Sequence, residues 1–124
     1  MTYDIQIDSG VAPSMLTAIA DITKEQFVGL DLQPAVAGAD ILGVCLKDTP
    51  TGSPISLACI GTFYLTVEVG AAETVNVGDV LELKDASTLI ALNLGVSVAK
   101  AYEKIDNSAG GTSVVKKIPV KIIK

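Results

Sequence analysis

Histidine, tryptophan and arginine are all missing from this chain of 124 residues, so its nine positive charges are all lysines. Without histidine the chain has no imidazole to act as a base near neutral pH and no histidine ligand for a metal ion. Without arginine it has no planar guanidinium to hold a phosphate through two parallel hydrogen bonds. Most enzyme mechanisms depend on these side chains. We therefore expect no catalytic residue, no metal site and no cofactor.

Cysteine and aromatic residues are scarce. The two cysteines, Cys45 and Cys59, are too few for a disulfide framework or a four-ligand zinc site. They lie at equal distances from Gly52, so a hairpin centred on Gly52 would place them side by side, near disulfide range. In a cytosolic protein, two small buried thiols are the better interpretation. Because aromatic residues make up only 4% of the chain, the core must consist of valine, isoleucine, leucine and alanine.

Long hydrophobic runs are also missing. Apolar stretches such as Ile41–Leu46 fall far short of the roughly 20 residues that span a bilayer, so we expect no membrane helix. The first eight residues carry acidic side chains instead of the basic and apolar regions of a secretory signal, which predicts a protein that is made and kept in a cytosol unless a leader was removed. The net charge of −5 repels a polyphosphate backbone, so nucleic acid is not an expected partner.

Short strands separated by turns predict an all-β fold. The clearest strand covers 63–69, where apolar and polar residues alternate, and a second alternating strand covers 118–122. A hairpin is predicted between the apolar runs 41–46 and 55–60. About eight short strands at spacings near ten residues indicate a small β-barrel or sandwich of short antiparallel strands. In Met15–Phe27, helical spacing competes with β-branched residues, so we expect irregular strand or one short helix at most.

The amino-terminal segment differs from the rest of the chain. We divide the sequence into an arm or first strand, residues 1–13, and a β-barrel domain, residues 14–124. Apolar and polar residues alternate strictly over the first eight positions, which predicts a strand with one dry face. A serine, a glycine and a proline then separate this strand from the body. The candidate contact residues on this segment are Thr2, Tyr3, Ile5 and Ile7.

Gly78 and Asp79 form the most distinctive local motif. Glycine reaches backbone conformations that other residues avoid, and an aspartate side chain can accept hydrogen bonds from nearby amides. A role for Asp79 as an acid or a ligand would require a second catalytic group, and none accompanies it in the sequence. The motif therefore predicts a structural turn.

The lysines near the carboxyl end admit two interpretations. The carboxyl-terminal strand has a basic edge within an acidic chain, formed by Lys116, Lys117, Lys121 and Lys124. Lysines on an edge strand protect it from pairing with other chains, which is the structural interpretation. The functional interpretation is contact with an acidic surface of a partner.

Several short segments, taken in order, resemble landmarks of the small capsid decoration proteins of tailed phages. They are Phe27–Asp31, Ala39–Val44, Gly52, Ile55–Ala58, Gly61, Val77–Val80 and Gly95–Val98, and the resemblance covers about residues 17–124. It implies a β-rich, commonly trimeric protein on the outer surface of the virion. Such proteins bind the expanded head at its three-fold positions and clamp neighbouring capsid subunits without catalysis. The resemblance therefore implies the major capsid protein as partner, a homotrimer, and a virion made in the host cytoplasm. The arm lies outside the resemblance, and its apolar stripe alone makes it a candidate capsid or subunit contact.

Two other functions stay open at this point. Another virion or tail structural protein would have a similar composition. A small-ligand or glycan-binding β-barrel module would show a concave pocket lined by aromatic residues, and the chain offers only Tyr3, Phe27, Phe63, Tyr64 and Tyr102 for one. An enzyme would instead show two acidic residues that converge with perturbed pKa values.

Overall fold

The computed structural model describes residues 16–123, and within that range the chain is all β, with no helix. The strands are β1 (Phe27–Gly29), β2 (Ile41–Cys45), β3 (Leu57–Ala58), β4 (Gly61–Val69), β5 (Thr74–Val75), β6 (Val80–Asp85), β7 (Thr88–Ala91), β8 (Ala99–Ala101), β9 (Ile105–Asp106) and β10 (Val114–Ile122). Five of them close into a barrel in the order β10, β4, β7, β6, β8. The predicted small β-barrel is confirmed.

The longest ladder of the barrel joins β4 and β10 over nine residues each, from the pair Gly61 and Ile122 to the pair Val69 and Val114. Every second side chain is buried over the second half of β4 and over 118–122 of β10, and Leu65, Val67 and Ile118 belong to the barrel core. The first four residues of β10 are all exposed. The period-two pattern of the sequence therefore corresponds to a barrel wall with one dry side and one wet side.

The expectation of antiparallel strands is wrong for one pair. β4 and β7 run parallel, with Thr66 beside Thr88 and Val67 beside Leu89, while the other neighbours in the barrel are antiparallel. The reason is closure. Five strands in a ring cannot all alternate in direction, so at least one neighbouring pair must be parallel.

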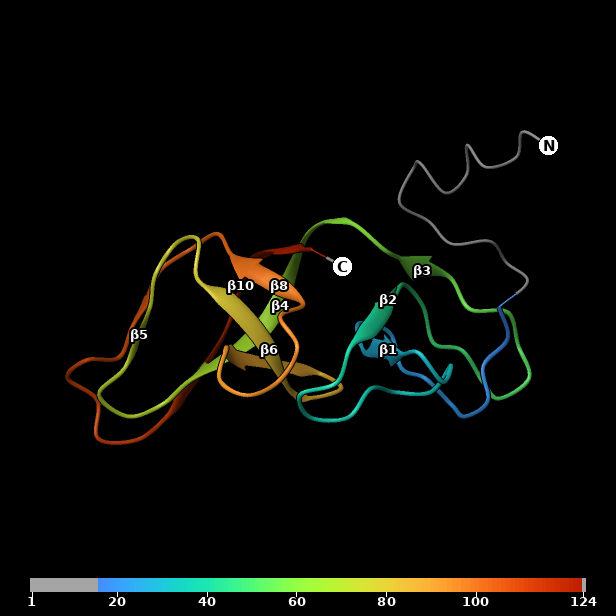
Figure 1. The fold of residues 1–124 in the computed structure, drawn as a ribbon, viewed down its shortest axis with the longest axis horizontal. Coiled ribbons are helices and arrows are strands. Elements are labelled where there is room, and N and C mark those ends of the chain that lie inside the picture. The colour runs from blue at the N-terminus through green and yellow to red at the C-terminus, as the bar shows by residue number, and fades with distance from the viewer. Residues whose placement is uncertain (1–15, 124) are drawn as a thin grey trace.

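A sheet of β1, β2 and β3 lies at one end of the barrel (Figure 1). Phe27 and Val44 on this sheet belong to the barrel core, whereas their neighbours Val28 and Cys45 belong to a second, smaller core. A sheet buried on both faces has no wet side, so its strands appear as continuous apolar runs. This accounts for the unbroken apolar character of 41–46.

The ambiguous segment before β1 forms no helix in the described residues. The amide of Ala18 donates to the carbonyl of Ser53 at 3.0 Å, and the amide of Ile22 donates to the carbonyl of Thr49 at 2.9 Å. Both amides bond to the loop between β2 and β3, where a helix would bond them to carbonyls four residues back. The irregular-strand alternative is thus correct. No helix in the described range is long and apolar enough to cross a membrane.

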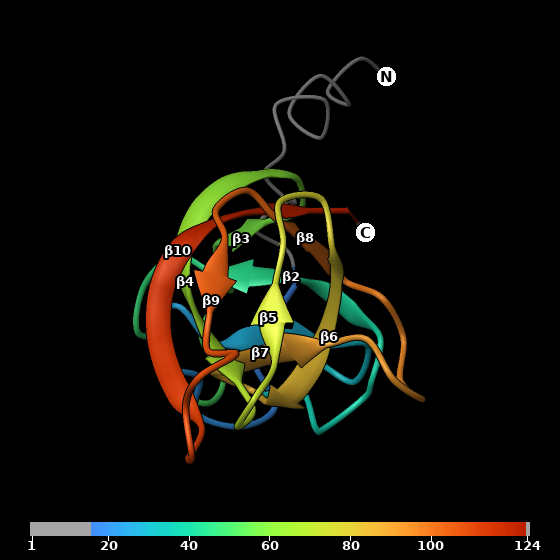
Figure 2. The same ribbon diagram turned by 90° about the vertical axis from the view of Figure 1, so that its left-hand side faces the viewer.

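A two-stranded sheet of β5 and β9 lies at the opposite end of the barrel (Figure 2). Asn107 follows β9, and its side chain is buried with an exposed fraction of 7% for the residue. Its Nδ2 donates to the carbonyls of Gly70 and Thr112, both at 2.9 Å. One amide group thereby joins the loop after β4 to the loop before β10.

A buried carboxylate holds the loop between β7 and β8 in place. Glu82 on β6 has an exposed fraction of 7%, and its Oε1 accepts hydrogen bonds from the amides of Asn93 and, at 3.0 Å, Gly95. The backbone of Gly95 lies directly against Gly38, and the amide of Val96 donates to the Gly38 carbonyl at 3.0 Å. This contact fixes the loop between β7 and β8 on the loop before β2.

Candidate protein-binding face

The outer surface of the barrel over β4, β10 and β8 carries two rows of side chains. The register places Tyr64 beside Pro119, and the amide of Tyr102 donates to the Pro119 carbonyl at 2.9 Å, which aligns these three residues across the strands. The next row contains Lys121, with Thr62 on one side and Lys100 on the other. We call the six residues the outer face: Thr62, Tyr64, Lys100, Tyr102, Pro119 and Lys121.

The outer face presents exposed aromatic rings. Tyr64 is 68% exposed and Tyr102 is 45% exposed, whereas Phe27 is fully buried and Phe63 is half-buried against the barrel core. The sequence offers Tyr64 and Tyr102 only as possible parts of a pocket. Both lie on the outside of the barrel, on either side of Pro119, and Tyr64 also borders the small hollow beside Phe63.

Lys100 and Lys121 lie directly opposite each other on neighbouring strands, and both are exposed. The ion pairs within the described residues join Lys84 to Glu68, Lys116 to Glu103 and Lys117 to Glu25, so neither Lys100 nor Lys121 has an acidic partner there. Like charges directly opposite each other on a sheet are destabilising. Among residues 16–123 the outer face therefore carries positive charge that no ion pair compensates, in a chain whose net charge is −5.

The two interpretations of the carboxyl-terminal lysines apply to different residues. Lys116 and Lys117 lie where β10 pairs with β4 alone, and they form ion pairs of 2.9 and 2.8 Å with Glu103 and Glu25. Lys121 lies where β10 is paired on both sides. Edge protection fits the first two lysines and leaves Lys121 unexplained.

Gly78 and Asp79 lie in the turn before β6. Gly78 has a φ of +92°, a conformation that favours glycine, and the Asp79 carboxylate accepts a hydrogen bond from the Asn76 amide at 2.8 Å. The Gly78 amide donates to the carbonyl of Ala101 at 2.7 Å, which ties the turn to the end of β8. The Asp79 carboxylate thus provides a hydrogen-bond acceptor for an amide of its own turn.

Cys45 and Cys59 do not lie opposite each other. The register of β2 and β3 places Cys45 opposite Leu57, so the hairpin is centred one residue before Gly52, and both cysteines are free thiols. Cys45 is buried, and its thiol donates to the Lys47 carbonyl at 2.9 Å. Cys59 is half-buried, and burial raises the pKa of its thiol. The interpretation as unpaired thiols fits both residues, and full burial holds only for Cys45.

This difference in burial leads to a prediction. Cys45→Ala should lower the free energy of unfolding by about 1–2 kcal/mol, because it removes a packed side chain from the smaller core, whereas Cys59→Ala should cost less. Urea denaturation measures both values. A thiol reagent added to the native protein should modify Cys59 first. Equal labelling of the two thiols, or a larger loss of stability for Cys59→Ala, would contradict the assignment.

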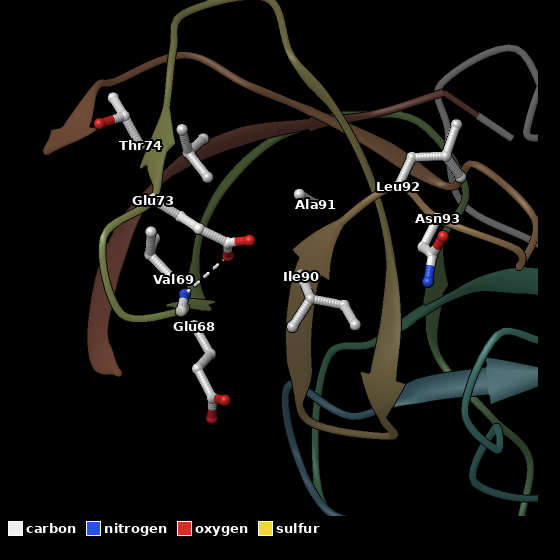
Figure 3. Close-up of a pocket in the computed structure, with 10 residues that line it drawn as sticks. Glu68, Val69, Glu73, Thr74, Ile90, Ala91, Leu92 and Asn93 are labelled. Atoms are coloured by element: carbon white, nitrogen blue, oxygen red, sulfur yellow. Dashed lines mark hydrogen bonds between the residues drawn. The ribbon is translucent and has the colours of Figure 1, made fainter. Parts of the chain in front are cut away.

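A groove of about 690 Å³ lies between the end of β4 and the β5 and β7 segments (Figure 3). The carboxylate of Glu68 is bound to Lys84 at 2.5 Å, and that of Glu73 accepts the amide of Gly70 at 3.2 Å. No aromatic side chain lines this groove. A smaller hollow beside Phe63 measures about 240 Å³, below the usual size of a ligand pocket. The groove lacks aromatic lining, and the smaller hollow, which Phe63 and Tyr64 line, is too small for a glycan-binding module.

Acidic and sulfur-containing side chains do not gather into a metal-binding group. Within residues 16–123, no three histidine, cysteine, aspartate or glutamate side chains lie close enough together to hold a metal ion. The predicted contact residues Thr2, Tyr3, Ile5 and Ile7 lie outside the described range. The arm therefore stays a prediction, and the outer face is the candidate site that the structure itself presents.

The sequence was compared with models of known protein families and with curated proteins. The model of a family described as phage cement protein matches residues 7–117 of the chain. A search of the curated proteins finds no match. The matched range includes the whole of the barrel except the last part of β10.

Proposed function

The chain belongs to the phage cement protein family, and on this premise we propose that it is a capsid decoration protein that binds and stabilises the outer surface of a phage head. The partner is the major capsid protein, and the location is the outside of the virion. The family match over 7–117 is the observation that carries the proposal. The small all-β fold and the exposed, uncompensated outer face support it.

A decoration protein stabilises a head by mass action. It binds the assembled shell and not the separated subunits, so its binding free energy adds to the stability of the shell without any chemical reaction. Such a protein needs a rigid surface, because binding then costs little conformational entropy. The closed barrel and the sheet buried on both faces supply this rigidity.

We also propose that the protein forms a homotrimer. The family resemblance is the first support, and exposed apolar side chains beside the three-stranded sheet are the second. Ile19 is 59% exposed, Leu30 is 63% exposed and Val36 is 69% exposed. Apolar side chains of this size are typical of contacts between subunits. Light scattering should give a mass three times the 12.8 kDa of one chain.

The arm, with Thr2, Tyr3, Ile5 and Ile7 as its contact residues, is proposed to hold the capsid. All five barrel strands come from residues 61–122, so the barrel is closed without the arm. This supports a role for the arm outside the barrel core. An extended segment with one apolar face can bind by adding a strand to the sheet of another chain.

Deleting residues 1–9 tests the proposed function and the arm together. The full chain should co-sediment with heads assembled without it. The truncated chain should stay folded and oligomeric but remain in the supernatant. Failure of the full chain to bind heads would contradict the proposed function. If the truncated chain unfolds, or if it binds heads as well as the full chain does, the arm is not the segment that binds the capsid.

A further inference from the structure

We infer that the outer face, formed by Thr62, Tyr64, Lys100, Tyr102, Pro119 and Lys121, docks onto an acidic patch of the capsid protein. This inference rests on the proposed function and adds the surface and the chemistry of the contact. It concerns the folded barrel and is independent of the arm.

The pair of lysines is the first argument. Lys100 and Lys121 face each other across neighbouring strands, and the other four members of the outer face are uncharged. In the isolated chain this arrangement costs free energy, because the two charges repel each other. It becomes favourable when carboxylates of a partner lie against the pair. The position of Lys121 in a strand paired on both sides excludes edge protection as its explanation.

The tyrosines are the second argument. Tyr64 and Tyr102 expose their rings at 68% and 45% on either side of Pro119, in the row next to the lysines. Tyrosine is enriched among residues that dominate binding energy, because it buries a large area and loses few rotamers. The strands beneath hold these side chains in register. The outer face therefore combines apolar anchors with positive charge on a rigid support.

The occupant is the capsid and not a second copy of this chain. Each acidic side chain in the described range already has a partner in its own chain, in loops or in ion pairs. For example, Asp21 accepts the amide and the hydroxyl of Thr51, both at 2.8 Å, and these two bonds, the amide first, lower its pKa. A two-fold contact of this face with itself would bring lysine against lysine. A two-fold contact therefore does not compensate the outer face, and a contact with a different surface of a second copy is the outcome that the mass measurement below detects.

Charge reversal at one lysine tests the inference. Full-length Lys121→Glu should bind heads assembled without this chain about tenfold more weakly than the unchanged protein, and Lys100→Glu with Lys121→Glu should abolish co-sedimentation at micromolar concentration. Lys47→Glu is the matched control, because it changes the net charge equally at an exposed position in the loop between β2 and β3. It should bind within about twofold of the unchanged protein.

A second variant tests the aromatic part. Tyr64→Ser removes an exposed ring without opening a cavity in the core, so the protein should fold normally and bind heads at least about fivefold more weakly. Circular dichroism and light scattering confirm fold and mass for each variant. Added salt should weaken binding of the unchanged protein more than binding of Lys121→Glu.

The outcomes separate the inference from the proposed function. If the unchanged protein does not bind heads, the proposed function fails. If it binds and the folded Lys121→Glu and double variants bind equally well, the inference is wrong and the proposed function stands. If the variants change the mass of the protein in solution, the outer face joins copies of this chain, and the inference is again wrong.

Discussion

Gly95→Ala is expected to lower the free energy of unfolding by about 2–4 kcal/mol. A Cβ atom on Gly95 would lie 2.6 Å from the Cα of Gly38 and 2.8 Å from Oε2 of Glu82. The first neighbour is backbone, and it is held in place, because the Gly38 amide donates to the Leu83 carbonyl at 2.9 Å and its carbonyl accepts the Val96 amide. The two loops must therefore separate to admit the methyl group.

The loss should be measured by urea denaturation against Gly111→Ala. A Cβ on Gly111 meets nothing within 4 Å, so this control should change stability by less than about 1 kcal/mol. Separation of the loops would also break the hydrogen bond from the Gly95 amide to Glu82 and leave part of a buried carboxylate unsatisfied. A Gly95→Ala protein as stable as the Gly111→Ala control would show that the contact between Gly38 and Gly95 is not tight.

The strands that could be predicted are those whose pattern reflects a single wet face. The alternation over 63–69 and 118–122 survives in β4 and β10, because the barrel wall has water on one side only. The apolar runs 41–46 and 55–60 did predict a hairpin. The expected pairing was wrong by two residues, because the loop between the runs offers several turn-forming residues and the sequence does not say which residues lie opposite each other.

Other features could not be predicted, because they depend on contacts between distant residues. β1 and β9 have three and two residues, too few for any periodicity to appear. The parallel pair of β4 and β7 follows only from closure with an odd number of strands. The burial of Glu82 depends on two loops that close over β6.

The outer face also combines a residue that the sequence singled out with residues that only the fold brings together. The sequence singled out Lys121, but the choice between edge protection and partner contact depended on whether β10 is an edge strand at that residue. Lys100, Tyr64 and Tyr102 join it only through the registers of β4 and β8 with β10. A surface assembled from three strands has no continuous sequence motif. The contact residues proposed in the arm remain a prediction from alternation alone.

Asn107→Asp is the second change with a large expected effect, a loss of about 2–4 kcal/mol at pH 7. The substitution keeps the shape of the side chain but replaces the Nδ2 group by an oxygen. That oxygen would face the carbonyls of Gly70 and Thr112, each of which now accepts a hydrogen bond of 2.9 Å. A buried negative charge would then lie against two carbonyl oxygens without a donor. The loops that meet at Asn107 should separate.

The pH dependence of this loss identifies its cause. In the folded variant the buried carboxyl has a raised pKa, because its charged form is penalised and its neutral form can donate one hydrogen bond. The penalty is therefore full at pH values above the folded pKa and disappears as the pH falls below the ordinary value of an aspartate. Thermal denaturation should show a smaller difference from the unchanged protein at pH 4 than at pH 7. Asn76→Asp, at an exposed position, is the control and should change the free energy of unfolding by less than about 0.5 kcal/mol at both pH values. If the loss for Asn107→Asp does not depend on pH, packing and not charge is its cause.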